Sequence, residues 1–259
     1  MAGVDAKRKK YVIANWKMYL NPEDSVKMGT LMQKKLRVRR GVDVGIAPSS
    51  LAIYEMSKKI DKKSIKLGAQ NIYWRDSGAY TGEVSAAELR GIAQFVLVGH
   101  SERRYIFGER NDDIKKKVAA ALRVNMTPVL CIGETRDEKD FGETSGVLYD
   151  QVLGGLSELA AEDVARVVIA YEPVWAISGN GRNARPATLE DVEEAVRLIR
   201  SHLNHLYGKK VAESVSVLYG GSVKSDNAAE FLEADGVDGL LVGSASTKLE
   251  EFLKIVEVA

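Results

Sequence analysis

The chain has 259 residues, close to the roughly 250 of a single β/α barrel. Its 37 Lys and Arg nearly balance its 36 Asp and Glu, which excludes the basic excess typical of nucleic-acid-binding proteins. A hydrophobic fraction of 45% and a charged fraction of 28% are typical of a globular protein that can bury a substantial core.

The first apolar run, Tyr11–Ala14, follows four basic residues that end at Lys10. This run is too short for the core of a signal peptide, and no later stretch reaches the length of a membrane span. The single cysteine, Cys131, cannot form an intramolecular disulfide or build a zinc site alone. We therefore expect a cytoplasmic protein with no metal and no membrane or nucleic-acid partner.

Eight such apolar runs, rich in Val, Ile and Leu, recur along the chain. Continuous apolar character, in place of alternation, predicts strands buried on both faces, as in a parallel sheet. The runs are Tyr11–Ala14, Val42–Ala47, Ile65–Ala69, Phe95–Val98, Pro128–Ile132, Val167–Tyr171, Val215–Tyr219 and Gly239–Val242.

Amphipathic segments between the runs predict the crossover helices that parallel strands need. The best examples are Asn111–Asn125, Ser145–Ala160 and Leu189–Tyr207. No Pro- or Ser-rich linker interrupts the pattern, so we expect one domain over residues 1–259. Eight β/α units in this length favour a single closed (β/α)8 barrel over an open doubly wound sheet.

Polar residues and glycines follow the predicted strands, and in a β/α barrel these strand ends form the mouth where catalytic residues gather. One Lys, one His and several Glu therefore face a common mouth. The residues are Asn15 and Lys17, Gln70 and Asn71, Gly99 to Glu102, Gly133 and Glu134, Glu172, Gly220 to Ser222, and Gly243 and Ser244.

The turns after the seventh and eighth strands predict a phosphate site. In barrel enzymes these two turns, leading into a helix N-terminus, commonly bind phosphate through backbone N–H groups. Gly220 and Gly221 alone would also fit a simple tight turn. Two such turns on neighbouring strands favour the phosphate site.

Three side chains at the mouth suit proton transfer. His100 begins a predicted helical turn, where the helix dipole favours the neutral imidazole that can donate a hydrogen bond to a carbonyl oxygen. Glu172 is a candidate general base, although a rim salt bridge would also fit. Lys17 fits an imine-forming amine, a surface lysine packed on Trp16, or an electrostatic clamp with Glu102 as partner, and the clamp fits best.

The sequence resembles the triosephosphate isomerase family over essentially its whole length. Seven segments in the family's order, at the predicted strand ends, carry this resemblance. They are Asn15–Met18, Gly68–Asn71, Tyr80–Glu83, Val98–Arg104, Leu130–Glu134, Tyr171–Ile177 and Tyr219–Val223.

The resemblance implies isomerisation of dihydroxyacetone phosphate to D-glyceraldehyde 3-phosphate through an enediol, without a cofactor or metal, in glycolysis and gluconeogenesis. It implies that Glu172 is the base, that His100 is the neutral electrophile, and that Lys17 and Asn15 stabilise the oxyanion. It also implies a homodimer, because Thr81 lies in a segment similar to the family's interdigitating loop. The implied phosphate-binding residues are Ser178, Ser222, Gly243 and Ser244, and the implied supporting residues are Ser101 and Glu102.

Two departures from the family pattern matter. The segment Ser178 to Thr188, which resembles the family's lid, is a few residues longer than usual and has Ser178 where glycine is common. We expect slower or altered lid closure with intact chemistry. Ser244 also replaces a common glycine, but its backbone N–H remains.

Other motifs fit the residues less well. The string from Gly179 to Ala184 matches a dinucleotide-binding fingerprint but does not join a strand to a helix, and the segment around His100 lacks the final glycine of a nucleophile elbow. His202 and His205 are expected on a solvated helix face. Two other functions remain open: an aldolase that uses Lys17 as an imine, and a catalytically silent phosphate-binding scaffold.

Overall fold

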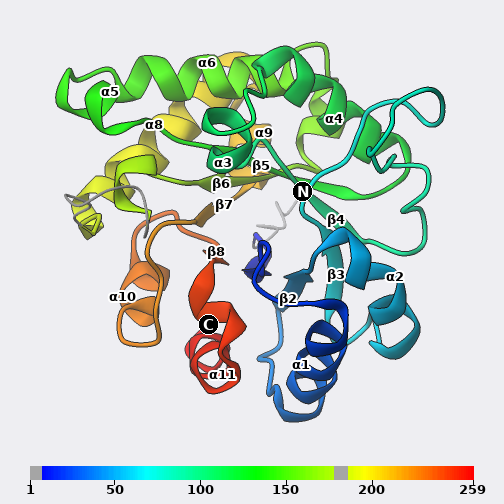
Figure 1. The fold of residues 1–259 in the computed structure, drawn as a ribbon. Coiled ribbons are helices and arrows are strands. Elements are labelled where there is room, and N and C mark those ends of the chain that lie inside the picture. Colours follow the sequence, from blue (N-terminus) through cyan, green and yellow to red (C-terminus); the bar gives the residue numbers. More distant parts are fainter. Residues whose placement is uncertain (1–7, 178–185) are drawn as a thin grey trace, which may run out of the picture.

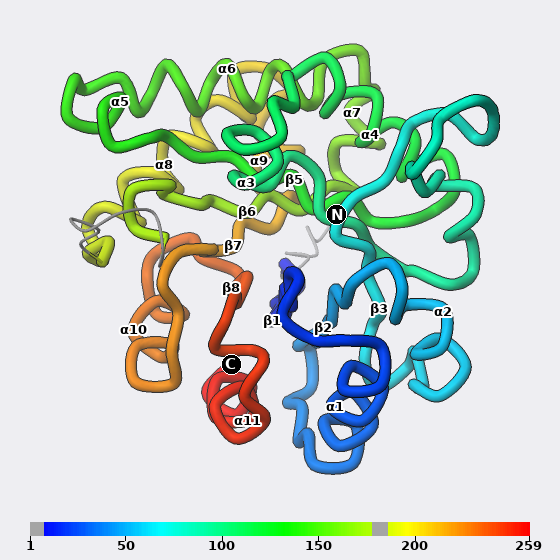
Figure 2. The backbone as a smooth tube through the Cα atoms, viewed as in Figure 1, coloured from blue at the N-terminus to red at the C-terminus, as the bar shows by residue number. Residues whose placement is uncertain are grey.

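The computed structural model describes residues 8–177 and 186–259. Their eight strands form one closed, all-parallel barrel in sequential order, surrounded by helices, as Figures 1 and 2 show. This confirms the predicted (β/α)8 barrel, and each strand agrees with its predicted run to within one residue at either end. The strands are β1 (Lys10–Asn15), β2 (Val42–Ala47), β3 (Lys66–Ala69), β4 (Phe95–Val98), β5 (Thr127–Ile132), β6 (Val168–Tyr171), β7 (Ser216–Tyr219) and β8 (Gly239–Val242).

The barrel closes where β1 pairs with β8, with Tyr11 opposite Gly239. A Cβ atom on Gly239 would lie 1.9 Å from the backbone oxygen of Tyr11. No side chain fits in that space, so closure at this point requires glycine.

Two apolar layers hold the barrel together. The inner layer fills the barrel with side chains such as Ile13, Leu97 and Leu218, while the outer layer packs the other faces of the strands against the helices. The Phe95 ring occupies the space that side chains on Gly45 and Gly68 would otherwise take. The interior of the barrel is therefore a packed core and not an open channel.

The helices lie outside the strands, as Figure 1 shows. They are α1 (Pro22–Lys35), α2 (Ser50–Lys59), α3 (Ser101–Tyr105), α4 (Asn111–Arg123), α5 (Arg136–Asp140), α6 (Thr144–Leu156), α7 (Ala161–Val164), α8 (Leu189–Tyr207), α9 (Lys209–Ser214), α10 (Ala228–Glu233) and α11 (Leu249–Glu257), with 3₁₀ turns η1 (Val174–Ala176) and η2 (Ser244–Thr247). Within the described ranges, no helix is both long and apolar enough to cross a bilayer.

The predicted helix over Leu189–Tyr207 is confirmed as α8, but two others end earlier than predicted. The helix from Asn111 ends at Arg123, and the one predicted over Ser145–Ala160 begins at Thr144 and ends at Leu156. In both cases a residue with positive φ follows: Asn125 at 62° and Glu158 at 70°. A left-handed residue cannot continue an α-helix, so the apolar periodicity extends a few residues beyond the true end of each helix.

Candidate active site

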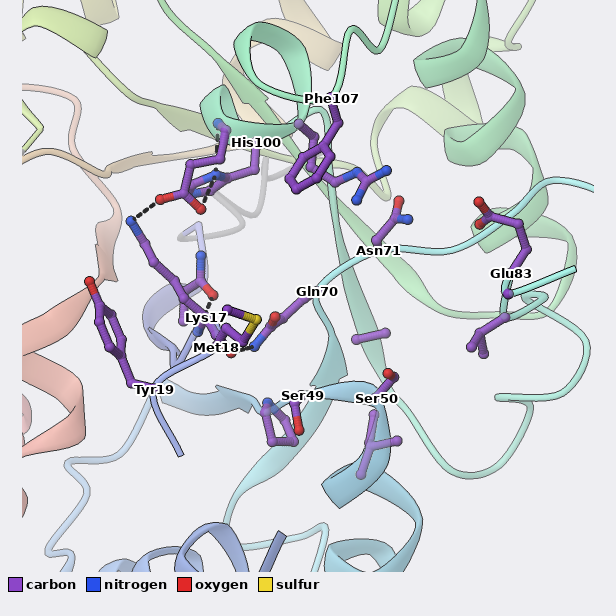
Figure 3. A pocket seen from close by; sticks show the side chains of 18 of the residues that line it. Lys17, Met18, Tyr19, Ser49, Ser50, Gln70, Asn71, Glu83, His100 and Phe107 are labelled. Carbon is purple, nitrogen blue, oxygen red and sulfur yellow. Dashed lines mark hydrogen bonds and ion pairs between the residues drawn. The ribbon is translucent and has the colours of Figure 1, made fainter. Parts of the chain in front are cut away.

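Side chains from β1, β4 and β6 meet at the carboxyl ends of the strands. The Lys17 Nζ lies 2.6 Å from the Glu102 Oε1, as a dashed line marks in Figure 3. The His100 Nε2 lies 3.2 Å from the Glu172 Oε1, and the other oxygen of Glu172 accepts the Ser101 N–H at 3.0 Å. The structure therefore brings together the predicted lysine, histidine and glutamate, and confirms Glu102 as the partner of Lys17.

Lys17 has a strained backbone, with φ at 46°, a conformation that lysine rarely adopts. Two side chains hold it in place. The Asn15 Oδ1 accepts the Lys17 N–H at 3.0 Å, and the Gln70 Nε2 donates to the Lys17 carbonyl at 2.7 Å and to the Ala47 carbonyl at 3.0 Å. The sequence placed Gln70 at a strand end, but gave no sign that it supports Lys17.

His100 is the N-cap residue of α3, which confirms the predicted helical turn. Its Nδ1 accepts the Glu102 N–H at 3.2 Å. Since an accepting nitrogen carries no proton, the neutral imidazole carries its proton on Nε2 and points it at Glu172. The local fold thus selects the tautomer whose Nε2 can donate a hydrogen bond.

Glu172 directly follows β6 and is only 2% exposed. Two glycines on neighbouring strands give it room. A Cβ on Gly220 would lie 2.9 Å from the Glu172 Cγ, and a Cβ on Gly133 would lie 1.8 Å from the Glu172 backbone oxygen. The sequence indicated Gly220 as part of the phosphate turn and did not indicate its contact with Glu172. The contact between Gly133 and Glu172 joins two strands, so no local sequence pattern reveals it.

A pocket of about 610 Å³ opens beside these residues. Asn15, Lys17 and His100 lie on its wall, whereas Glu172 does not line it and lies behind His100. Figure 3 shows that Met18 and Tyr19 after β1, Gln70 and Asn71 after β3, and Phe107 after α3 surround the same space. The pocket thus extends from Lys17 and His100 toward the β2, β3 and β4 loops.

The predicted phosphate turns lie on the opposite side of Lys17. A Cβ on Gly243 would lie 3.7 Å from the Lys17 Cε, so the lysine stem passes along the β8 turn. After β8 the 3₁₀ turn η2 begins at Ser244, whereas after β7 the next helix, α10, begins only at Ala228. The Asn227 side chain holds the intervening loop, donating to the Ser222 carbonyl at 3.0 Å and accepting the Lys224 N–H at 2.8 Å.

Ser178 lies outside the described residues, as does most of the predicted lid. Its part in substrate binding stays a prediction. The described residues on its two sides are Ile177 and Pro186.

Glu134, at the end of β5, is fully buried below the chain that follows Glu172. Its Oε1 accepts the Tyr171 hydroxyl at 3.0 Å and the Trp175 indole N–H at 2.8 Å. Burial raises the pKa of Glu134 above its ordinary value, against these two hydrogen bonds, which lower it. The sequence placed this carboxylate at the mouth, but it binds two aromatic residues of β6 and η1 there.

Among residues 8–177 and 186–259, no group of three or more His, Cys, Asp or Glu side chains could hold a metal ion. His202 was expected on a solvated face of α8, and this is only partly right. His205 is exposed, but His202 is half-buried and packs edge-to-face on Tyr149 of α6, with ring centroids 5.3 Å apart. This aromatic contact lies between two helices and away from the strand ends.

A (β/α)8 barrel with a buried glutamate, a histidine and a lysine converging at its strand ends is the architecture of an enzyme that acts in that mouth. Residues 10–259 match the sequence model of the family described as triosephosphate isomerase. The chain therefore belongs to the triosephosphate isomerase family, whose enzymes interconvert dihydroxyacetone phosphate and D-glyceraldehyde 3-phosphate in glycolysis and gluconeogenesis. This confirms the resemblance found in the motifs.

Similar proteins named triosephosphate isomerase cover nearly the whole chain. The one from Carboxydothermus hydrogenoformans is 41% identical over 251 residues, which are 96% of this chain and 98% of that protein. The one from Chloroherpeton thalassium is 42% identical over 254 residues, with 97% and 99% covered, and the one from Clostridium tetani is 42% identical over 257 residues, with 99% of each covered.

Proposed function

We propose that this chain interconverts dihydroxyacetone phosphate and D-glyceraldehyde 3-phosphate, with Glu172 as the base. Its carboxylate takes a proton from the carbon beside the substrate carbonyl and returns it to the neighbouring carbon. The observation that carries this proposal is the 3.2 Å contact between the Glu172 Oε1 and the His100 Nε2. This contact supports the proposal, because the His100 Nδ1 accepts the Glu102 N–H and its Nε2–H can therefore donate beside Glu172.

In this proposal His100 and Lys17 stabilise the charge that develops on oxygen. The Nε2–H of His100 donates to the carbonyl oxygen as it becomes an enediolate, and the Lys17 ammonium lies nearby, on a backbone that Asn15 and Gln70 hold. Donors fixed before the reaction need little reorganisation when charge appears. Ser101 and Glu102 support them by binding Glu172 and Lys17.

We further propose that the β7 and β8 turns bind the substrate phosphate through the backbone N–H groups of Ser222, Gly243 and Ser244. The Lys17 stem beside Gly243 supports this position, because it lets one cation attract the phosphate while its ammonium remains near the reacting oxygens. Ser178 is expected to add a further N–H.

The test is turnover of glyceraldehyde 3-phosphate in an assay coupled to a dehydrogenase. Wild-type protein is expected to be active, and Glu172→Gln to lose activity by a factor on the order of 10²–10⁴, because the amide accepts the Ser101 N–H but cannot take a proton. Glu194→Gln, which changes an exposed carboxylate on α8, is the control and should be unaffected. An active Glu172→Gln variant would contradict the assigned base.

The two rival functions give different results. The Lys17 ammonium is held by Glu102 at 2.6 Å, which supports an electrostatic role over that of an imine-forming amine. Permanent labelling of Lys17 by borohydride with substrate would support the aldolase. No turnover by the purified wild-type chain would support the silent scaffold.

We also propose that the chain is a homodimer. The strand-end loops that surround the 610 Å³ pocket expose large apolar side chains, among them Met18 at 94%, Ile106 at 71% and Phe107 at 66%. Thr81 is exposed in a neighbouring loop and suits insertion into such a pocket of a second copy. Light scattering should give twice the chain mass, whereas a fully active monomer would refute the dimer.

A single domain over residues 1–259 and a cytoplasmic location complete the proposal. The unbroken β/α order supports the first, and the lone buried cysteine, Cys131, suits a reducing compartment. One cooperative unfolding transition and recovery of activity in the cytosolic fraction would be the expected results.

A further inference from the structure

Lys139, in the short helix α5 that follows Glu134, contacts two segments at once. Its Nζ lies 3.1 Å from the Asp191 Oδ1 in the first turn of α8 and 5.6 Å from the centroid of the Trp175 ring in η1. The side chains of Lys139 and Asp191 are only 19% and 13% exposed. Such an ion pair is better shielded from solvent than the exposed pairs elsewhere on the surface, where the interaction is worth little.

The α8 contact is anchored by helix capping. The Asp191 Oδ2 accepts both the backbone N–H and the hydroxyl of Thr188, at 3.0 and 3.1 Å, while its Oδ1 contacts Lys139. Burial raises the pKa of Asp191, but the hydrogen bonds from Thr188 and the charge of Lys139 together lower it by more. The pKa of Asp191 therefore lies below its ordinary value. Asp191 therefore ties Lys139 to the start of α8.

The η1 contact is anchored by Glu134. The Trp175 indole N–H donates to the Glu134 Oε1 at 2.8 Å, and the Val174 N–H donates to the Glu134 carbonyl at 3.0 Å. The face of the same ring lies under Lys139, in a cation–π arrangement. The edge of the indole is thus bound by a carboxylate, and the ring lies near two cations, the Lys139 ammonium and the Arg136 guanidinium 6.0 Å from the centroid, all from one short stretch of chain.

Trp175 lies three residues after Glu172, inside the 3₁₀ turn η1, which Pro173 precedes as the N-cap residue. We expect a shift of the indole to reach Glu172, because proline fixes its own φ and the 3₁₀ turn fixes the residues that follow. Lys139 does not line the 610 Å³ pocket, so its effect on the reaction is expected to pass through Trp175.

We propose that Lys139 is a positioning residue for the isomerisation: by holding Trp175 and Asp191 together, it joins the chain after β6 to the start of α8 and keeps the segment that carries Glu172 in place at the end of β6. This inference rests on the proposed role of Glu172 as the base. According to this proposal, the Lys139 ammonium affects the rate of proton transfer although it lies outside the pocket.

The experiment compares Lys139→Met, which keeps the length and removes the charge, with Lys139→Arg, which keeps a cation for both contacts. Lys139→Met should lower kcat about tenfold with KM changed less than about twofold, because the base is displaced by a fraction of an ångström. Lys139→Arg should restore most of kcat. Asp191→Asn should lower kcat in the same direction, and adding it to Lys139→Met should cost little more, because both remove one contact.

The control is Lys115→Met, which removes the ammonium from the 2.7 Å ion pair with Glu158 between α4 and the loop after α6. It should leave kcat unchanged. Thermal unfolding of each variant separates positioning from folding: a destabilised Lys139→Met with wild-type kcat would overturn the inference, as would a folded Lys139→Arg that is as slow as Lys139→Met. If wild-type protein were inactive, the proposed function itself would fail instead.

Discussion

Gly133 is the position at which one added methyl group should most disturb the proposed base. It lies at the end of β5, opposite Glu172 at the end of β6. A Cβ there would lie 1.8 Å from the Glu172 backbone oxygen, whereas real Cβ atoms essentially never come closer than 3.0 Å. In Gly133→Ala the two strand ends must therefore separate by about 1.2 Å.

The Gly133 side cannot absorb this movement easily. The Gly133 N–H donates to the Gln151 Oε1 at 2.8 Å, and the Gln151 Nε2 donates back to the Gly133 carbonyl at 3.1 Å. Since this buried side chain of α6 fixes both ends of the glycine, Glu172 is expected to take most of the displacement. A misplacement of about 1 Å costs on the order of 100-fold in rate, or about 2.7 kcal/mol of activation free energy.

The assay is steady-state turnover of Gly133→Ala together with thermal unfolding. We expect kcat to fall by about two orders of magnitude and the free energy of unfolding to fall by about 1–3 kcal/mol. Gly146→Ala is the control: nothing lies within 4 Å of a Cβ at this exposed position of α6, so it should keep its activity. A folded Gly133→Ala variant with wild-type kcat would refute the reasoning that this contact places the base.

Two further predictions concern stability. Arg104→Lys should lower the free energy of unfolding by about 2–3 kcal/mol in urea titrations. The Arg104 guanidinium binds the carbonyls of Gly99 and Cys131 and the Asn111 side chain, and a lysine ammonium cannot reach all three. An unchanged unfolding midpoint would contradict this. Burial lowers the pKa of His202 below 6.5, helped by His205 and opposed by the Ser145 backbone, so the unfolded chain takes up a proton more readily. The free energy of unfolding of the wild-type protein should therefore fall as the pH drops from about 7 to about 5, and that of His202→Phe should fall less. Equal pH slopes for the two proteins would contradict this prediction.

The strands could be predicted because burial on both faces leaves an uninterrupted apolar run, and the mouth could be predicted because parallel strands end on one side. The helix ends at Arg123 and Leu156 could not, since Asn125 and Glu158 adopt positive φ in a way that residue type alone does not dictate. The helix over Leu189–Tyr207 was predicted correctly from its apolar periodicity, and in the structure the Thr188 cap and Gly208 bound it at the same residues.

For the site, the sequence indicated Lys17, His100 and Glu172 by their place after a strand, but not what holds them. Gln70 supports the strained Lys17 backbone from two strands away, and Gly133 leaves room for Glu172 from the neighbouring strand. These contacts join residues that are distant in sequence and depend on the barrel's register. The loop between β7 and α10 also depends on a contact that residue type does not reveal, because the Asn227 side chain donates to the Ser222 carbonyl.

The closure between β1 and β8 also bears on how the chain reaches its native state. The Trp16 indole donates to the Ser246 carbonyl, and Arg8 binds Asp238, in each case across 230 residues of sequence. Until β8 has been synthesised, β1 has an unpaired edge that can pair with another chain. The barrel therefore stays open during most of its synthesis, because β8 is the last strand to leave the ribosome. Contacts this distant in sequence also form slowly.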